Sequence, residues 1–155
     1  ATHMGLSQQM AVHSVERAYQ TVVYGGFAQD EGFVETNLGR SKTDRKKMAV
    51  TDKNSKNAVT NYRTLEVFNG WSLCEFRLET GRTHQIRVHA SYRGHPIAGD
   101  PLYAPNAGKN RFGLAGQCLH ARVLGFIHPT SGEYMEFSSP LPPYFEAVLE
   151  KLRRL

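Results

Sequence analysis

Residues 15–24 alternate between apolar and polar side chains, the pattern of a strand with one buried face. Arg17 and Tyr19 fall on one face of this predicted strand, whereas Ala18 and Val22 fall on the other. Two glycines follow and end the segment. Because tyrosine is a good strand former, Tyr19 can be an ordinary core or edge aromatic as well as a functional one.

Two further stretches predict hairpins. Residues 27–38 indicate a short hairpin with Gly32 at its turn. Residues 58–68 predict a longer strand, and the Asn69-Gly70 pair after it is a strong hairpin signal. That turn leads into Trp71–Leu78, which alternates again. Successive strands joined by tight turns favour antiparallel pairing.

The pattern changes period after residue 78, where Thr80-Gly81 breaks the strand. Thr83 is a suitable cap for a helix that begins at His84 and runs to about Tyr92. Strands at residues 118–127 and 133–138 and an amphipathic helix at residues 144–155 complete the predicted elements. We therefore expect an α+β domain with few helices and a mixed, mainly antiparallel sheet.

Bulk composition narrows the class of protein. The chain has 155 residues, which suits one domain, and a net charge of +5 that is compatible with a polyanionic partner. Cys74 and Cys118 lack the spacing of metal ligands, so free thiols in a cytoplasmic protein are the simplest interpretation. No apolar run is long enough to span a bilayer, and no metal cluster or nucleotide-binding glycine motif is present. We expect no membrane association, metal or cofactor.

The junction after the central strand concentrates candidate chemistry. Arg82, His84 and Arg87 lie where a turn meets a helix N-terminus, an arrangement that favours anions. His84 and His89 are five residues apart, so they do not form an i, i+4 metal pair. Arg87 lies between two apolar residues and is expected to point inward, where a guanidinium needs a carboxylate or phosphate. The alternative is a surface helix with solvated arginines.

A basic run lies between the second and third strand candidates. Its cations are Arg40, Lys42, Arg45, Lys46 and Lys47, opposed only by Asp44. Such runs are usually solvated surface, but Gly39 and Ser41 here suggest a mobile loop that can follow a phosphate backbone.

Two motifs in this order resemble those of the RluA-type RNA pseudouridine synthases. One is Leu78–His89, read as L-x-T-G-R-T-H-Q-I-R-V-H, and the other is Gly94–Tyr103, read as G-H-P-hydrophobic-x-G-D-x-x-Y. Arg17-Ala18-Tyr19 is similar to the (K/R)-x-Y strand of that family, and the resemblance extends over nearly the whole chain. It implies the pseudouridine synthase catalytic-domain fold.

The resemblance also implies an activity and roles. The family detaches uracil from a uridine in ribosomal or transfer RNA and rejoins it through C5, without cofactor or metal. Tyr19 would stack on the target base and Arg87 would pair with the essential aspartate, giving two catalytic residues. Arg82, His84 and the basic run of residues 40–47 would bind RNA. Asp100 precedes a proline in a turn, so a structural role is favoured over a catalytic one.

One family element is missing from the sequence. The essential aspartate follows His-Arg-Leu, yet none of the aspartates here, Asp30, Asp44, Asp52 and Asp100, has that context. We therefore expect residues 1–155 to be the C-terminal portion of one catalytic domain, inactive alone, with an unpaired sheet edge and with Arg87 deprived of its carboxylate. The missing N-terminal part would be a partner; the RNA modified and the oligomeric state are not specified. The alternative is a non-catalytic RNA-binding module.

Overall fold

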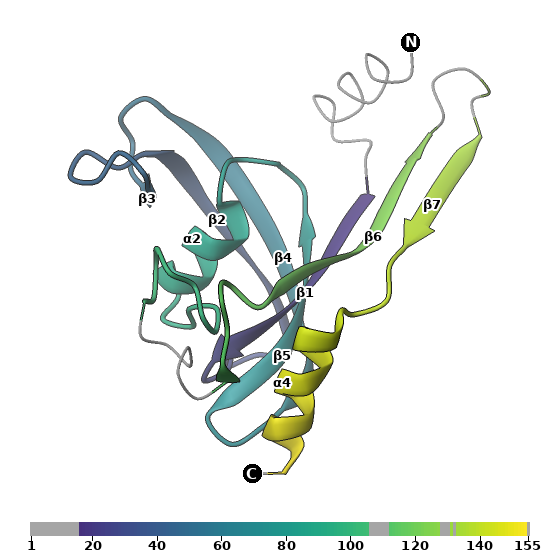
Figure 1. Cartoon of the computed structure of the whole chain (residues 1–155). Helices are drawn as coiled ribbons and strands as arrows, with labels where there is room; N and C mark the ends of the chain where they lie inside the picture. The colour runs from purple at the N-terminus through teal and green to yellow at the C-terminus, as the bar shows by residue number, and fades with distance from the viewer. Residues whose placement is uncertain (1–15, 106–111, 128–130, 132, 155) are drawn as a thin grey trace.

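The computed structural model describes residues 16–105, 112–127, 131 and 133–154. These residues form one sheet with helices packed on it (Figure 1). The strands are β1 (Glu16–Tyr24), β2 (Glu31–Arg40), β3 (Met48–Val50), β4 (Ser55–Val67), β5 (Trp71–Leu78), β6 (Leu119–Ile127) and β7 (Tyr134–Ser138). The helices are α2 (Gln85–Tyr92) and α4 (Pro143–Arg153).

The sheet has seven strands in the order β3-β2-β4-β5-β1-β6-β7. All of the strand pairs within the described residues are antiparallel, so the α+β class is confirmed and the parallel component of a mixed sheet is not found there. The first strand lies in the middle of the sheet, between β5 and β6. As a result Tyr19 is opposite Phe76 on one side and Ala121 on the other.

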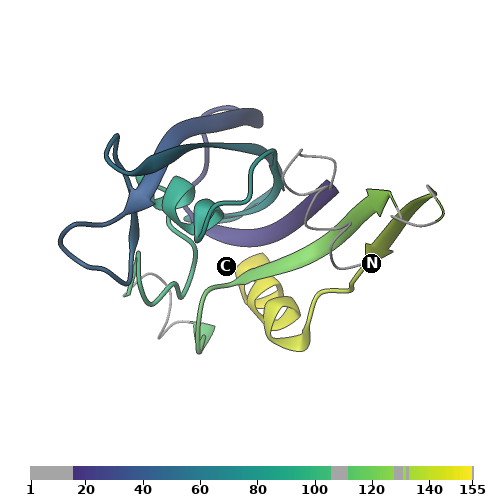
Figure 2. The same ribbon diagram turned by 90° about the horizontal axis from the view of Figure 1, so that it is seen from above.

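Each face of β1 supplies one hydrophobic core, as the alternation of its residues predicts. Val22 packs with Trp71 and with Phe145 of α4. Val23 belongs to a second cluster that contains Ile86 of α2, and Tyr19 packs against this cluster. Figure 2 shows the consequence, with α2 and α4 on opposite sides of β1 and β6. We call these the α2 face and the α4 face of the sheet.

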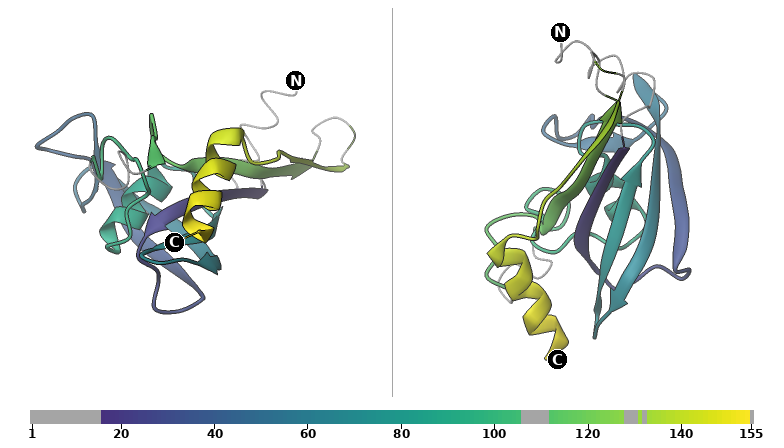
Figure 3. Two further views of the ribbon diagram at one scale, coloured as in Figure 1. Left: turned by 60° about the horizontal axis from the view of Figure 1, so that its bottom comes forward. Right: turned by 90° about the vertical axis from the view of Figure 1, so that its right-hand side faces the viewer.

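The sheet is bent rather than flat, and Figure 3 shows the β6–β7 hairpin diverging from the other strands. The β1–β6 pairing shifts its register between Ala18 and Tyr19. The predicted C-terminal helix is confirmed as α4, which buries Phe145, Val148, Leu149 and Leu152. Its apolar stripe closes the core of the α4 face.

The hairpin predicted for residues 27–38 is wrong, because Gly32 lies inside the continuous strand β2 opposite Tyr62. A Cβ at this glycine would lie 2.5 Å from Tyr62 Oη, so the residue leaves room for the ring rather than forming a turn. Tyr62 in turn stacks on Phe27, with ring centroids 4.0 Å apart. The glycine is required by a side chain from a neighbouring strand.

Candidate functional site

The loop between β5 and α2 is closed by the side chain of Gln85. Its Oε1 accepts hydrogen bonds from the Thr80 hydroxyl at 2.7 Å and from the backbone N–H of Arg82 at 2.9 Å. Its Nε2 donates to the carbonyl of Val59 and to Thr60 Oγ1, both at 2.9 Å. Every hydrogen-bonding position of this buried amide is thereby used. Gln85 therefore fixes the loop that carries Arg82 against strand β4.

His89 continues the same buried network towards β2. Its Nδ1 lies 2.7 Å from Thr60 Oγ1 and its Nε2 lies 2.9 Å from Thr36 Oγ1. The ring is fully buried, and this burial lowers the pKa of His89 from 6.5 to about 4. His89 is thus a neutral structural histidine, and with both nitrogens engaged by threonines it is not positioned to ligate a metal.

The helix begins one residue later than predicted, and Thr83 is not its cap. The N-cap position of α2 is His84, which has a left-handed backbone with φ of 55° and makes no side-chain capping bond. This conformation is uncommon for a residue other than glycine. Instead of capping the helix, the imidazole Nδ1 lies 2.8 Å from the hydroxyl of Tyr103. Burial, and then the charge of Arg87, lower the pKa of His84.

Arg87 points inward as predicted, but it is not deprived of a carboxylate. Its Nε and Nη2 donate to the two oxygens of Asp100 at 2.9 and 2.8 Å, a bidentate ion pair. Asp100 Oδ1 also accepts the backbone N–H groups of Leu102 and Tyr103. Burial alone would raise the pKa of Asp100, but the bonds from Arg87 and these amides outweigh it and the pKa is lowered. These contacts fit the structural role expected for Asp100.

Tyr103 joins three segments of the chain. Its hydroxyl accepts the backbone N–H of Met48 at 2.9 Å and contacts His84, and the Arg87 guanidinium lies 5.2 Å from the centre of its ring. The ammonium group of Lys47 lies 6.0 Å from the same ring. The basic run, the motif helix and the turn after Asp100 therefore meet at one phenol on the α2 face.

The basic run, which was predicted to be a mobile loop, forms a hydrogen-bonded turn, and its mobility stays a prediction. Gly39 is part of β2, opposite Ala49, and Ser41 N–H donates to the carbonyl of Lys47. Asp44 Oδ1 accepts the backbone N–H of Lys46 and helps to close the turn. The cations point outward from it: Arg40, Lys42, Arg45 and Lys46 are exposed, and Lys47 is half-buried.

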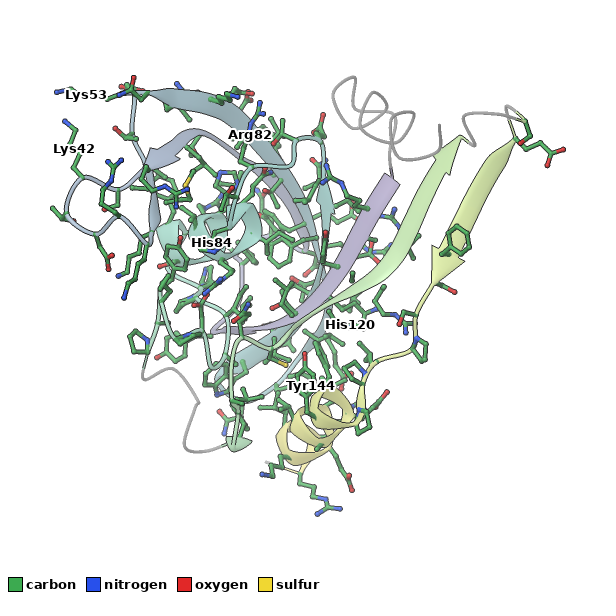
Figure 4. The ribbon with its side chains drawn as sticks, turned by 45° about the horizontal axis from the view of Figure 1, so that its top comes forward. Lys42, Lys53, Arg82, His84, His120 and Tyr144 are labelled. Carbon is green, nitrogen blue, oxygen red and sulfur yellow. The ribbon has the colours of Figure 1, made fainter. Side chains whose placement is uncertain are left out.

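Lys53, which lies just before β4, adds to the positive charge of the basic run. Lys42 and Lys53 lie at the same corner of the molecule in Figure 4, which also shows Arg82 and His84. The neighbouring Lys53 ammonium group, and to a smaller extent desolvation, lower the pKa of Lys42. Two cations held this close repel each other, and a bound anion would relieve the repulsion. Lys53 therefore adds a cation to those of the basic run.

The two predicted catalytic residues lie on the same face of the sheet. Tyr19 is half-buried and packs against the cluster that contains Ile86, the residue next to Arg87. Arg82 is half-buried and its Nε donates to the carbonyl of Asn57 at 2.9 Å. The prediction that Tyr19 and Arg87 flank one nucleobase remains a prediction.

Two residues of the site, Gln85 and Tyr103, were not identified from the sequence, because the groups that they contact are distant in sequence. Gln85 and Tyr103 are both in the quoted motifs, yet neither has a chemical role that its own neighbours in sequence would indicate. The signal available was the G-D-x-x-Y spacing, which places a carboxylate three residues before a phenol. The contacts of Asp100 and Tyr103 with Arg87 are formed only in the folded chain.

Within the described part of the chain, no group of three His, Cys, Asp or Glu side chains is arranged to hold a metal ion. No helix among the described residues is long and apolar enough to cross a membrane. Cys74 and Cys118 are buried and free, and burial raises their thiol pKa values to about 11 and about 12. Unreactive buried thiols are part of the core rather than of the site.

The antiparallel sheet and its T-G-R-T-H-Q-I-R-V-H junction define the class to which this chain belongs. Residues 1–92 match the family described as RNA pseudouridylate synthase. The chain is therefore a member of that family, and its resemblance to the RluA-type enzymes is confirmed.

Individual relatives agree with this assignment. The chain is 47% identical over 152 residues to an uncharacterised RNA pseudouridine synthase of Bacillus subtilis, covering 98% of this chain and 49% of the relative. It is 43% identical over 156 residues to the ribosomal large subunit pseudouridine synthase D of Zymomonas mobilis, covering 97% and 49%. It spans about half the length of these curated relatives.

A solved structure supports the fold alone. The human RNA pseudouridylate synthase domain containing 1 superposes with a TM-score of 0.77 at 24% identity, over 98% of this chain and 71% of that one.

Proposed function

We propose that this chain is part of an RNA pseudouridine synthase that isomerises uridine to pseudouridine in ribosomal or transfer RNA. The observation that carries the proposal is the Arg87–Asp100 pair, which fixes a guanidinium on the same face of the sheet as Tyr19. A half-buried phenol and a fixed cation on one face of the sheet suit a site that receives a base taken out of its stack. Tyr19 and Arg87 act on the flipped uridine.

The exposed cations supply the second requirement, contact with the RNA backbone. Arg40, Lys42, Arg45 and Lys46 are exposed at the turn after β2. Lys47 and His84 both contact Tyr103, and Arg82 lies on the loop before α2, bonded to Asn57. Phosphate contacts of this kind position a nucleic acid without reading its sequence. Choice of the target uridine then depends on other contacts, and we propose structured ribosomal or transfer RNA as the substrate class.

We further propose that the chain alone does not convert uridine to pseudouridine. The family aspartate follows His-Arg-Leu, and this context is absent from the sequence. Asp100 is fully buried, and each of its oxygens is already bonded to Arg87. It orients Arg87, so it is not available to react with a base. The essential carboxylate would come from a segment equivalent to the other half of the relatives. The two buried thiols fit a cytoplasmic protein.

Release of tritium from RNA containing [5-³H]uridine tests the proposal directly. We expect no release by this chain alone, and release after fusion to the part of the Bacillus subtilis relative that this chain does not cover, which would supply the essential carboxylate. In the fusion, Tyr19→Phe and Arg87→Gln should abolish release. Arg63→Gln is the matched control, because Arg63 is exposed and contacts Glu75 on the α4 face.

Two results would contradict this proposal. Turnover by the chain alone would show that it lacks no essential group. Salt-sensitive RNA binding by a folded fusion that never releases tritium would favour the alternative, a non-catalytic RNA-binding module that uses the same cations.

A further inference from the structure

Arg17 is an arginine on the α2 face for which the described residues provide no partner. No hydrogen bond or ion pair joins its side chain to any described residue, and its Nε is buried without an acceptor. Two other arginines of this face are engaged: Arg87 binds Asp100, and Arg82 donates to a backbone carbonyl. Because desolvating a cationic donor is costly unless an acceptor replaces water, Arg17 is suited to an acceptor from outside these residues.

The guanidinium of Arg17 lies against the backbone of the motif loop at Gly81. A Cβ built on Gly81 would be 2.5 Å from Nη1 of Arg17 and 2.9 Å from its Nη2. The absence of a side chain at Gly81 lets the end of the Arg17 side chain lie against the T-G-R-T-H loop, and a Cβ there would displace the flexible guanidinium. Gly81 itself is exposed, so a ligand can approach the guanidinium from the loop side.

The charges around Arg17 favour an anion from a polyanion over a carboxylate of the described chain. Glu79, two residues before Gly81, accepts a hydrogen bond from Asn61 instead of pairing with Arg17. The next residue along the loop, Arg82, is another cation. Two arginines from different elements therefore border the same loop, and a guanidinium binds phosphate oxygens well.

Arg17 is also placed correctly with respect to the nucleotide that the proposed function assigns to Tyr19. The two residues are on one strand and on the same face, so their Cα atoms are roughly 6.6 Å apart. One short segment of RNA can reach both. We propose that Arg17 is an RNA-binding residue whose guanidinium, seated on Gly81, binds a backbone phosphate next to the target uridine. This inference rests on the proposed function.

Fluorescence anisotropy with a fluorescein-labelled RNA hairpin carrying uridines in its loop tests this inference on the 155-residue chain. Across a series of salt concentrations, we expect Arg17→Gln to weaken binding about tenfold at low salt and to reduce the salt slope by about 1, the loss of one phosphate contact. Arg17→Lys should keep the slope but recover only part of the affinity, because the bidentate geometry is lost.

Gly81→Ala provides an independent variant that leaves Arg17 in the sequence. The added Cβ should displace the guanidinium and weaken RNA binding in the same direction as Arg17→Gln. The double variant should bind no more weakly than Arg17→Gln alone, because both changes remove one contact. Arg63→Gln, on the α4 face, is the control and should change neither affinity nor slope.

The outcomes separate this inference from the proposed function. If the unaltered chain binds the hairpin in a salt-dependent manner but Arg17→Gln binds equally well, the inference on Arg17 is overturned and the RNA function stands. The inference is overturned in the same way if Arg17→Gln lowers the melting temperature and leaves RNA affinity intact, since the guanidinium then contributes to folding and not to RNA binding. Absence of RNA binding by the folded, unaltered chain overturns both.

Discussion

Arg87 and Asp100 form a bidentate ion pair that is closed off from solvent at the carboxylate and 12% exposed at the guanidinium. The pair links helix α2 to the turn that follows it, and both partners have further bonds or ring contacts that fix their orientation. The result is an arginine whose direction is set by the fold rather than by solvent. A substrate can therefore meet it in a defined position.

Replacing Asp100 by Asn should destabilise the chain strongly. The change leaves the half-buried guanidinium without its charge partner, which typically costs about 3 kcal/mol or more in the free energy of unfolding. Urea denaturation measures this quantity. Glu66→Gln is the control, because its pair with Arg153 is exposed and should contribute less than about 1 kcal/mol. Equal losses in the two variants would contradict the structural role of Asp100.

His89 should make stability depend on pH between about 6.5 and 4. The unfolded chain binds a proton below pH 6.5, whereas the folded chain, in which the pKa of His89 is about 4, does not. The free energy of unfolding should therefore fall as the pH falls through this window, by up to about 3 kcal/mol. Asp100 titrates below it, since its pKa is lowered from 3.8.

Urea denaturation at about pH 7 and about pH 4.5 gives two free energies of unfolding whose difference measures the effect, because most of the range between the two pKa values of His89 lies between these pH values. In His89→Gln the difference between the two free energies of unfolding should shrink, even though this variant is less stable at both. An unchanged difference would assign the pH dependence to other groups.

Tyr103→Phe should loosen the attachment of the basic turn. The variant leaves the backbone N–H of Met48 without its acceptor and removes the partner of His84 Nδ1, which should cost about 1–2 kcal/mol. Hydrogen exchange should show faster exchange at the Met48 amide. Tyr144→Phe is a matched control, because its hydroxyl is 3.5 Å from the carbonyl of Leu119, too far for a strong bond. Unaltered protection at Met48 would rule out the attachment.

Gly32→Ala should destabilise the chain by about 1–3 kcal/mol through overpacking. The new methyl group meets the buried ring of Tyr62, which stacks on Phe27 and has little freedom to move. Gly116→Ala should be close to neutral, because a Cβ there meets nothing within 4 Å. Thermal denaturation of both variants tests the contrast, and similar melting temperatures would be evidence against the packing described.

Features with a local signal were predicted from the sequence. The alternation of Val22 and Val23 is a property of successive residues, and it located the two faces of β1 correctly. The inward direction of Arg87 likewise follows from its apolar neighbours. Family membership followed from ungapped motifs, which are themselves local features of the sequence.

Features that depend on distant residues were missed. Gly32 has the appearance of a turn glycine until the ring of Tyr62 on β4 is known to cover it. The carboxylate of Arg87 lies thirteen residues later in a turn, and the hydroxyl beside His84 lies nineteen residues later. The position of β1 between β5 and β6 likewise depends on pairings with strands far along the chain.

The Gln85 side chain bonds back to Thr80 and to the backbone N–H of Arg82, so residues 80–85 form a closed loop. The same side chain bonds to the carbonyl of Val59 on strand β4. Such a closure sets the number of residues between the threonine and the glutamine. Substitutions at the solvent-facing Thr83 leave the ring of bonds intact, whereas an inserted or deleted residue opens it. Among homologous chains, the segment from Thr80 to Gln85 should therefore vary at exposed positions such as Thr83 but keep a constant number of residues.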